Sequence, residues 1–191
     1  MLPNSMRFCF AICILVYTSV PYAQNTAELW SVLGSTDHFA MIRHALAPGL
    51  GDPAHFKLGD CSTQRNLSQE GRDQAKQIGL LFNQHGIHRA KVYSSEWCRC
   101  IDTAQHMNLG MVNRLPALNS FFQHQERQDS QVLALRKWLD TQTLDQPLVL
   151  VTHQVNITAF TGVYPASGEM VVIKRQGHDY QVVGTIETLK P

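Results

Sequence analysis

The sequence predicts an α/β fold in which helices cover both faces of a mostly parallel central sheet, giving three layers. Short apolar segments suited to buried strands alternate with helical segments, an order typical of parallel α/β sheets. We find no internal repeat, low-complexity tract or long linker that would divide the chain. Residues 24–191 are long enough to bury a single core.

Residues 1–23 are predicted to be a secretory signal peptide, and residues 24–191 a single domain. Arg7 precedes an unbroken apolar run, Phe8–Val16, and small Ala23 ends the segment. This order is typical of signal peptides, and the run is shorter than the roughly 20 residues that a membrane span needs. We therefore expect an exported, periplasmic protein with no membrane span after cleavage; an uncleaved N-terminal anchor is the alternative.

The N-terminal half is predicted to begin with a short helix over Thr26–Ser35 and a buried strand over His38–Ile42. Ala45–Arg65 is rich in Gly, Pro and Asp, and we expect a long ordered loop, a kind of segment that is usually functional. Ser68 can cap a helix that runs to His85. Its buried stripe is formed by residues at spacings of three and four: Ala75, Ile78, Gly79 and Phe82.

The C-terminal half continues the alternation and ends in a hairpin. The elements are expected in this order: a strand at Lys91–Tyr93, a helix at Glu96–Met107, an amphipathic helix marked by Val132, Leu135 and Leu139, a buried strand at Leu148–Val151 followed by a short helix, and paired strands at Met170–Ile173 and Tyr180–Val183.

Polar residues suited to phosphate binding follow three of the predicted strands. Arg43 and His44 follow the first strand, Ser95 and Arg99 follow the second, and His153 follows the Leu148–Val151 run. Ligands of open α/β sheets bind beyond the carboxyl ends of the strands. We therefore expect these side chains to meet at one rim.

These residue types suit phosphoryl transfer. The guanidinium group presents a planar fork of donors that matches phosphate oxygens and keeps its charge. Two such groups can hold a dianion and stabilise charge in the transition state. A neutral imidazole is a competent nucleophile, and its ordinary pKa of about 6.5 leaves much of it neutral near pH 7. This chemistry requires no metal and no cofactor.

The segments that carry these residues resemble the motifs of the histidine phosphatase superfamily, which has the phosphoglycerate-mutase-like fold. Four motifs occur in family order: Ile42–Ala45 resembles its Arg-His-Gly motif, Arg65–Gly71 its Leu-Ser/Thr-x-x-Gly helix start, Val92–Ala104 its Ser-Ser-x-x-x-Arg-x-x-x-Thr-Ala segment, and Val149–His153 the strand that delivers its second histidine. One motif alone is weak, but four in order strongly indicate the family. The resemblance is to exported bacterial members.

The resemblance implies a role for each main candidate. His44 would attack phosphorus and carry a phosphohistidine, which water then hydrolyses. Arg43 and Arg99 would clamp the phosphoryl oxygens, and His153 would complete the pocket.

Two weaker candidates for phosphate or substrate binding are Arg65 and Ser95. Pairing of Arg65 with a nearby acid is an equal alternative. The long loop at Ala45–Arg65 and the stretch at Ser120–Asp129 are expected to shape the mouth of the pocket.

The chain departs from the family pattern at the glycine and at the general acid. Ala45 replaces the motif glycine. Mutase-like members protonate the leaving oxygen with the glutamate of a Leu-x-Glu segment, and here that segment is Leu118-Asn119-Ser120. The other branch places Asp after the second histidine, where this chain has Gln154. The general acid is therefore unplaced, with four candidates from nearby loops: Glu126, Asp129, Glu96 and Glu169.

A missing acid would favour a leaving group that needs no proton, such as that of a phosphohistidine or an acyl phosphate. It would equally fit a slow or lost activity.

The cysteine pattern predicts one disulfide. An oxidising compartment allows disulfides, and signal cleavage would leave Cys61, Cys98 and Cys100. Cys98 and Cys100 diverge on a helix, so we expect Cys61 to pair with Cys98 or with Cys100. A cysteine phosphatase would need an arginine at position 104 or 106, and neither position has one.

Charge and motif content exclude further classes. The chain has 16 Lys and Arg against 15 Asp and Glu, and signal cleavage would remove one basic residue. General binding of nucleic acid or of membrane surfaces is therefore not expected. No nucleotide-binding glycine motif or trusted zinc spacing occurs.

We expect a metal-independent phosphomonoesterase that acts on a small phosphorylated substrate. The first alternative is a phosphate-binding or interaction protein that keeps the pocket with weak or lost catalysis. The second is a mutase, whose glycolytic substrates an exported protein would rarely meet.

Overall fold

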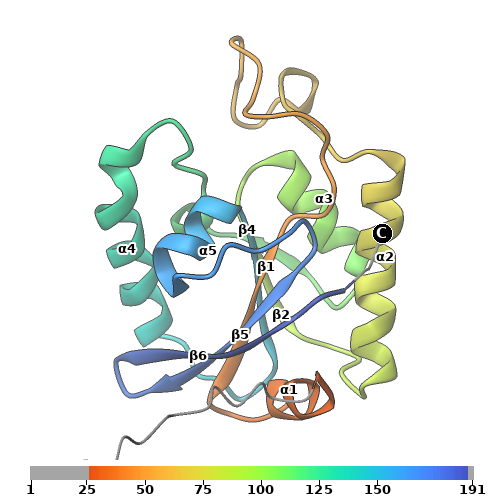
Figure 1. Ribbon diagram of the computed structural model, residues 1–191, viewed down its shortest axis with the longest axis vertical. Helices are drawn as coiled ribbons and strands as arrows, with labels where there is room; N and C mark the ends of the chain where they lie inside the picture. Colours follow the sequence, from red (N-terminus) through yellow and green to blue (C-terminus); the bar gives the residue numbers. More distant parts are fainter. Residues whose placement is uncertain (1–25, 189–191) are drawn as a thin grey trace, which may run out of the picture.

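The computed structural model describes residues 26–188, which form a six-stranded sheet with helices on both faces (Figure 1). The order of strands across the sheet is β3-β2-β4-β1-β5-β6. The strands are β1 (His38–Arg43), β2 (Lys91–Ser94), β3 (Val112–Arg114), β4 (Leu148–Thr152), β5 (Met170–Gln176) and β6 (Asp179–Ile186). The signal peptide predicted for residues 1–23 lies outside the described residues.

Four neighbouring strands run parallel, and the last two form an antiparallel hairpin. β1 pairs with β4, and β2 pairs with β4 and β3, in parallel register, whereas β5 is antiparallel to both β1 and β6. The predicted, mostly parallel α/β sheet is thus confirmed. Arg43 lies opposite Thr152 and Ser94 lies opposite Val151, so β1, β2 and β4 end at the same edge.

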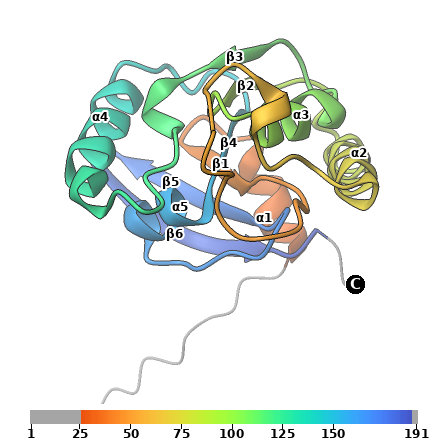
Figure 2. The ribbon, with the colours of Figure 1, turned by 90° about the horizontal axis from the view of Figure 1, so that it is seen from above.

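Helices form the outer two layers. They are α1 (Thr26–Leu33), α2 (Gln69–Gln84), α3 (Cys98–Met107), α4 (Gln128–Asp140) and α5 (Gln154–Thr161), with short 3-10 helices at Cys61–Thr63, Pro116–Leu118 and Gln125–Arg127. α1, α2 and α3 cover one face, and α4 and α5 cover the other (Figure 2).

The two cores follow from the alternation of side chains along the central strands. On β1, Ala40 and Ile42 face the core beneath α1, α2 and α3, whereas Phe39 and Met41 face the core beneath α4 and α5. All five residues of β4 are buried. Both faces of the central strands are therefore apolar, and polar side chains appear only where these strands end.

Several elements differ from the predictions. α1 ends at Leu33 rather than Ser35, and the hairpin strands extend to Met170–Gln176 and Asp179–Ile186. β3 was not expected, and its three residues are only partly buried or exposed. α3 begins at Cys98 rather than at Glu96, because Trp97 keeps an extended backbone as the N-cap (φ −69°, ψ 136°). Between residues 26 and 188, no helix is long and apolar enough to span a membrane.

Candidate active site

A cavity of about 110 Å³ lies at the carboxyl edge of the parallel strands. β1 leads into Arg43 and His44, β4 leads into His153, and α3 carries Arg99 in its first turn. Arg65, near the end of the segment between β1 and α2, completes the cationic lining. The structure thus gathers the four main site candidates and Arg65 around one cavity.

His44 is held as a single neutral tautomer. Its Nδ1 lies 2.8 Å from the carbonyl oxygen of Ala45, which can only accept, so Nδ1 carries the proton. Arg99 Nε donates to His44 Nε2 at 3.2 Å, so Nε2 presents a lone pair. Burial, followed by the charge of Arg99, holds the pKa of His44 well below 6.5. The imidazole is therefore neutral, and the lone pair of its Nε2 lies beside a guanidinium group.

His153 is also neutral, and its ring nitrogens contact Arg99, Ser95 and the Cys100 thiol, whose Sγ lies 3.5 Å from Nε2. Arg99 Nη2 lies 3.4 Å from His153 Nδ1, so Nδ1 accepts and Nε2 carries the proton, which points to Ser95 Oγ at 2.8 Å. Burial is the main cause that lowers the pKa of His153 well below 6.5. Without a bound anion, His153 therefore adds no positive charge to the cavity.

Ser95 does not bind at the cavity, contrary to the prediction. It is fully buried, and its hydroxyl accepts from His153 and donates to Asn119 Oδ1 at 3.3 Å. The hydroxyl at this strand end therefore contacts His153 and does not line the cavity.

Arg43 and Arg65 keep guanidinium donors for an anion. Arg43 Nη1 donates to the carbonyl of Pro165 at 2.9 Å, and its buried Nε has no partner among the described residues. Arg65 Nε donates to the carbonyl of Gly51 at 2.7 Å, and its Nη1 donates to Ala47. Burial and then the charge of Arg99 lower the pKa of Arg65 to about 10, so it stays charged at neutral pH. Within residues 26–188, its side chain forms no ion pair with an acid.

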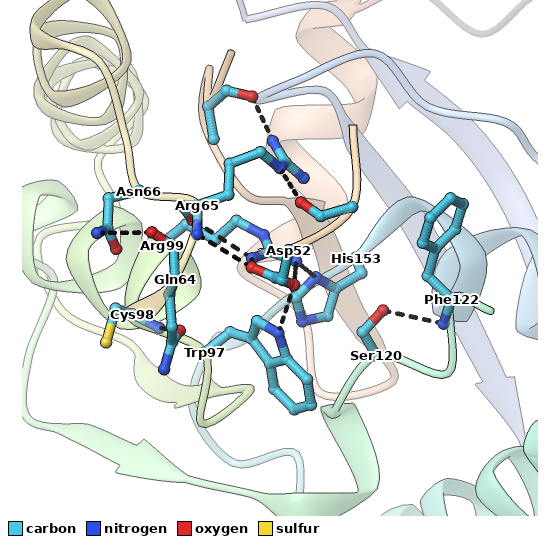
Figure 3. A network of polar contacts seen from close by, with 12 residues as sticks. Asp52, Gln64, Arg65, Asn66, Trp97, Cys98, Arg99, Ser120, Phe122 and His153 are labelled. Atoms are coloured by element: carbon cyan, nitrogen blue, oxygen red, sulfur yellow. Dashed lines mark hydrogen bonds and ion pairs between the residues drawn. The ribbon is translucent and has the colours of Figure 1, made fainter. Parts of the chain in front are cut away.

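Asp52 is the site residue that no sequence motif singled out. Its carboxylate accepts from Arg99 Nη1 at 2.8 Å and from Arg99 Nη2 at 3.2 Å. The Nε1 of Trp97 also donates to it, at 3.0 Å (Figure 3). Asp52 lies in the Gly- and Pro-rich loop, 47 residues before Arg99, so its only sequence signal is membership of a loop that was expected to be functional.

Ala45 fits where the resembling motif has glycine. Its φ is not positive, since Asn108 and Gln123 are the only non-glycine residues with positive φ in the described part of the chain. Its side chain packs with Ala47, Leu67 and Ala75. The peptide after His44 therefore does not need glycine.

The start of α2 supports the segment after His44. Ser68 Oγ accepts from the Gly71 N–H at 3.0 Å, and the Ser68 N–H donates to the Leu46 carbonyl at 3.1 Å. A Cβ on Gly71 would lie 2.0 Å from that same carbonyl oxygen. This glycine is thus required by close approach of two backbones.

No carboxylate lines the cavity among the described residues. Ser120, at the expected acid position, does line it. Glu96 binds Asn119 Nδ2 at 2.7 Å, and Glu169 accepts from the Ala166 N–H at 2.7 Å. Glu126 and Asp129 are exposed on the surface. The structure therefore brings none of these four acid candidates to the cavity.

Apolar and aromatic side chains contribute to the lining of the cavity. Leu50, Phe122, Val155 and Tyr164 line it together with the cationic groups. Leu50 is 88 % exposed and Tyr164 is 73 % exposed. The cavity therefore combines a cationic base that suits phosphate with apolar side chains at its rim.

A disulfide joins Cys61 to Cys98, one of the two pairings left open by the sequence. It links the loop to the first residue of α3, next to Arg99. Cys100 is free and buried, and burial raises the pKa of its thiol to about 12, so it is a poor nucleophile at neutral pH. No cluster of three or more potential metal ligands occurs within residues 26–188.

Comparison with known proteins relates the chain to one family. The family model "Histidine phosphatase superfamily (branch 1)" matches residues 40–121, which include His44, Arg99 and Ser120. No curated protein matches the chain by sequence.

Three similar solved structures support the same fold. The product of open reading frame Rv3214 from Mycobacterium tuberculosis has a TM-score of 0.58 and 13 % sequence identity, with 78 % of this chain and 96 % of that chain covered. The protein histidine phosphatase SixA complexed with tungstate has a TM-score of 0.56 and 11 % identity, with 79 % of this chain and 97 % of that chain covered. Mycobacterial glucosyl-3-phosphoglycerate phosphatase with inorganic phosphate has a TM-score of 0.58 and 13 % identity, with 80 % of this chain and 98 % of that chain covered.

Proposed function

Because the chain belongs to the histidine phosphatase superfamily, we propose that it is a metal-independent phosphatase that forms a phosphohistidine on His44. The tautomer of His44 carries the proposal: its Nδ1 proton is tied to Ala45, and its Nε2 lone pair lies beside Arg99. In the part of the chain that the structure describes, three arginines and no carboxylate line the cavity, which favours a phosphate dianion.

In the proposed reaction, His44 Nε2 attacks phosphorus and the bond from phosphorus to the leaving group breaks. The leaving group departs with the electron pair of that bond. Arg43, Arg65 and Arg99 stabilise the charge on the three remaining oxygens. A water molecule then attacks phosphorus and breaks the P–N bond, which releases inorganic phosphate and restores the lone pair of His44.

The lining of the cavity bears on the choice of substrate. Since no carboxylate lies there to protonate a leaving group, substrates whose leaving groups need little protonation are favoured, such as a phosphohistidine or an acyl or aryl phosphate. The apolar rim suits such groups better than a sugar. The similarity to a structure named as a protein histidine phosphatase agrees with this substrate class.

Export to the periplasm is part of the proposal. The disulfide between Cys61 and Cys98 supports it, because disulfides persist in oxidising compartments. The signal peptide predicted for residues 1–23 is the second support.

Turnover of p-nitrophenyl phosphate, whose leaving group needs little protonation, tests the proposed chemistry. With excess chelator present, we expect the purified chain to release inorganic phosphate. His44→Ala should lower turnover by about 10³-fold or more, because it removes the nucleophile. His88→Ala, which alters an exposed histidine, is the matched control and should keep full turnover.

Other outcomes would reject this function. Phosphate binding without turnover would favour the alternative of a phosphate-binding protein. The absence of a general acid from the cavity lining is the observation that motivates this alternative. Turnover that His44→Ala leaves unchanged, or that the chelator abolishes, would also contradict the proposal. Transfer of phosphate between two positions of one sugar, without release, would indicate a mutase.

A further inference from the structure

The guanidinium group of Arg99 uses two different edges. Nε and Nη2 contact His44 Nε2 and His153 Nδ1, at 3.2 and 3.4 Å. Nη1 and Nη2 bind the carboxylate of Asp52 in a bidentate pair, at 2.8 and 3.2 Å. One edge therefore faces the two histidines, and the other is occupied by a carboxylate from the loop.

Asp52 is itself held in place. The backbone N–H of Arg65 donates to Oδ1 at 3.1 Å, and Trp97 Nε1 donates to Oδ2 at 3.0 Å. Trp97 in turn stacks on Phe56, with ring centroids 5.1 Å apart. Figure 3 shows the carboxylate lying between the arginine and the indole. Asp52 is thus a fixed member of the site that contacts the edge of Arg99 adjacent to the one facing the two histidines.

The same contacts exclude a role for Asp52 as the missing general acid. Burial alone would raise its pKa, but the hydrogen bonds and charge of Arg99 outweigh burial and lower the pKa below its usual range. The carboxylate is ionised at neutral pH and accepts from four N–H donors, so it has no proton to give. Asp52 is also absent from the lining of the cavity, whereas Arg99 lines it.

We propose that Asp52 is a positioning residue that acts through Arg99, holding the Nε–Nη2 edge of the guanidinium toward the phosphoryl site beside His44 and His153. This inference rests on the proposed phosphatase function. A guanidinium without this support would lose its fixed orientation, and a displacement of about 1 Å can cost on the order of 10²-fold in rate.

The test is a double-mutant cycle of Asp52→Ala and Arg99→Ala. We expect Asp52→Ala to lower kcat for p-nitrophenyl phosphate by about 10- to 100-fold, with a smaller change in KM. In the Arg99→Ala background, the same change should lower kcat by less than about 3-fold, because coupled residues are not additive. Asp60→Ala alters an acid of the same loop that contacts Ser62 rather than Arg99 and should leave kcat unchanged.

Two measurements keep the test independent of folding and of turnover. Asp52→Asn, of nearly the same shape, should also lower kcat, and the loss should persist when kcat is measured at a temperature at which circular dichroism shows the variant to be fully folded. The affinity for inorganic phosphate, measured by calorimetry, should show the same coupling in the cycle. If the wild type binds phosphate with this coupling but never turns over, the phosphatase proposal fails and the role of Asp52 stands.

Two results would overturn the inference. Equal losses from Asp52→Ala with and without Arg99 would mean that Asp52 does not act through the arginine. A gain in phosphate affinity on removing the carboxylate would mean that Asp52 competes with substrate for Arg99, so that it blocks the site instead of ordering it.

Discussion

Ser120 occupies the position where mutase-like relatives carry the glutamate that protonates the leaving group. Its side chain lines the cavity, and its hydroxyl accepts from the Phe122 N–H at 3.2 Å. A serine hydroxyl is too weak an acid to replace a carboxylic acid in proton transfer. Under the proposed function, the residue at 120 therefore limits which leaving groups can depart.

Ser120→Glu is expected to widen the range of substrates. A carboxylic acid at this position should raise kcat for an alkyl phosphate such as glycerol 3-phosphate by about 10-fold or more. Turnover of p-nitrophenyl phosphate should change by less than about 3-fold, because that leaving group needs little protonation. The gain should grow as pH falls, because the nearby arginines favour the ionised carboxylate and only the protonated form can donate.

The ratio of the two rates is the measurement. Ser120→Gln has the same shape and cannot supply the proton, so it should not change the ratio. Equal acceleration of both substrates by glutamate, or the same effect from glutamine, would show that proton donation is not what the serine site lacks.

The candidate site residues that follow strands could be predicted from the sequence, whereas Asp52, which is held only by tertiary contacts, could not. Arg43, His44 and His153 sit at strand ends, where burial stops and a local pattern marks them. Asp52 gains its role from Arg99, 47 residues away, and nothing near it in the chain indicates that partner. Ser95 has the local signal, yet its hydroxyl is turned to His153.

At the scale of elements, the sequence predicted those with a long apolar pattern. The α2 helix buries the expected stripe and begins after Ser68, the expected cap. β3 has three residues and a polar centre at Asn113, so no alternation can reveal it. In the described sheet it pairs with β2 alone and lies at the edge. Its position therefore depends on contacts with β2, which the local sequence of β3 does not indicate.

The packing of α2 against the segment after β1 gives a prediction about Gly71. A methyl group there would lie 2.0 Å from the Leu46 carbonyl oxygen, so one backbone must move. We expect Gly71→Ala to lower the free energy of unfolding by about 1–3 kcal/mol. We also expect lower kcat, because Leu46 follows the nucleophile by two residues. Urea denaturation and turnover of p-nitrophenyl phosphate measure the two effects.

Gly34→Ala is the matched control for this change. A Cβ at Gly34 would lie 3.6 Å from its nearest neighbour, an ordinary contact, and the free energy of unfolding should change by less than about 0.5 kcal/mol. A stable, fully active Gly71→Ala protein would contradict the close approach of α2 and the segment after His44.

At the scale of the whole molecule, two buried neutral histidines make folding depend on pH. Burial lowers the pKa of both His44 and His153 well below 6.5. In the unfolded chain their imidazoles take up protons near pH 6.5, whereas in the folded protein they remain neutral until lower pH. Between the two pKa values the unfolded state binds more protons, so acidification favours unfolding.

The free energy of unfolding should therefore fall as pH drops below 6.5, by at most about 1.4 kcal/mol per pH unit for each histidine. Above pH 6.5 their contribution is fully present. Carboxylates whose pKa is lowered in the folded protein, such as that of Asp52, change the free energy of unfolding only near and below their ordinary pKa of 3.8. Measurements between about pH 4.5 and 6.5 therefore separate the effect of the histidines from that of the carboxylates.

Urea denaturation across this range tests the prediction through its slope with pH and not through absolute stability. His153→Gln should reduce the slope by about half, because one buried proton-binding site is removed. His88→Gln, at an exposed position, should leave it unchanged. A slope that His153→Gln does not alter would mean that this histidine takes up its proton in the folded protein as readily as in the unfolded chain. The assignment of a neutral His153 with an unprotonated Nδ1 facing Arg99 would then be wrong. The cavity would carry a further positive charge at mildly acidic pH.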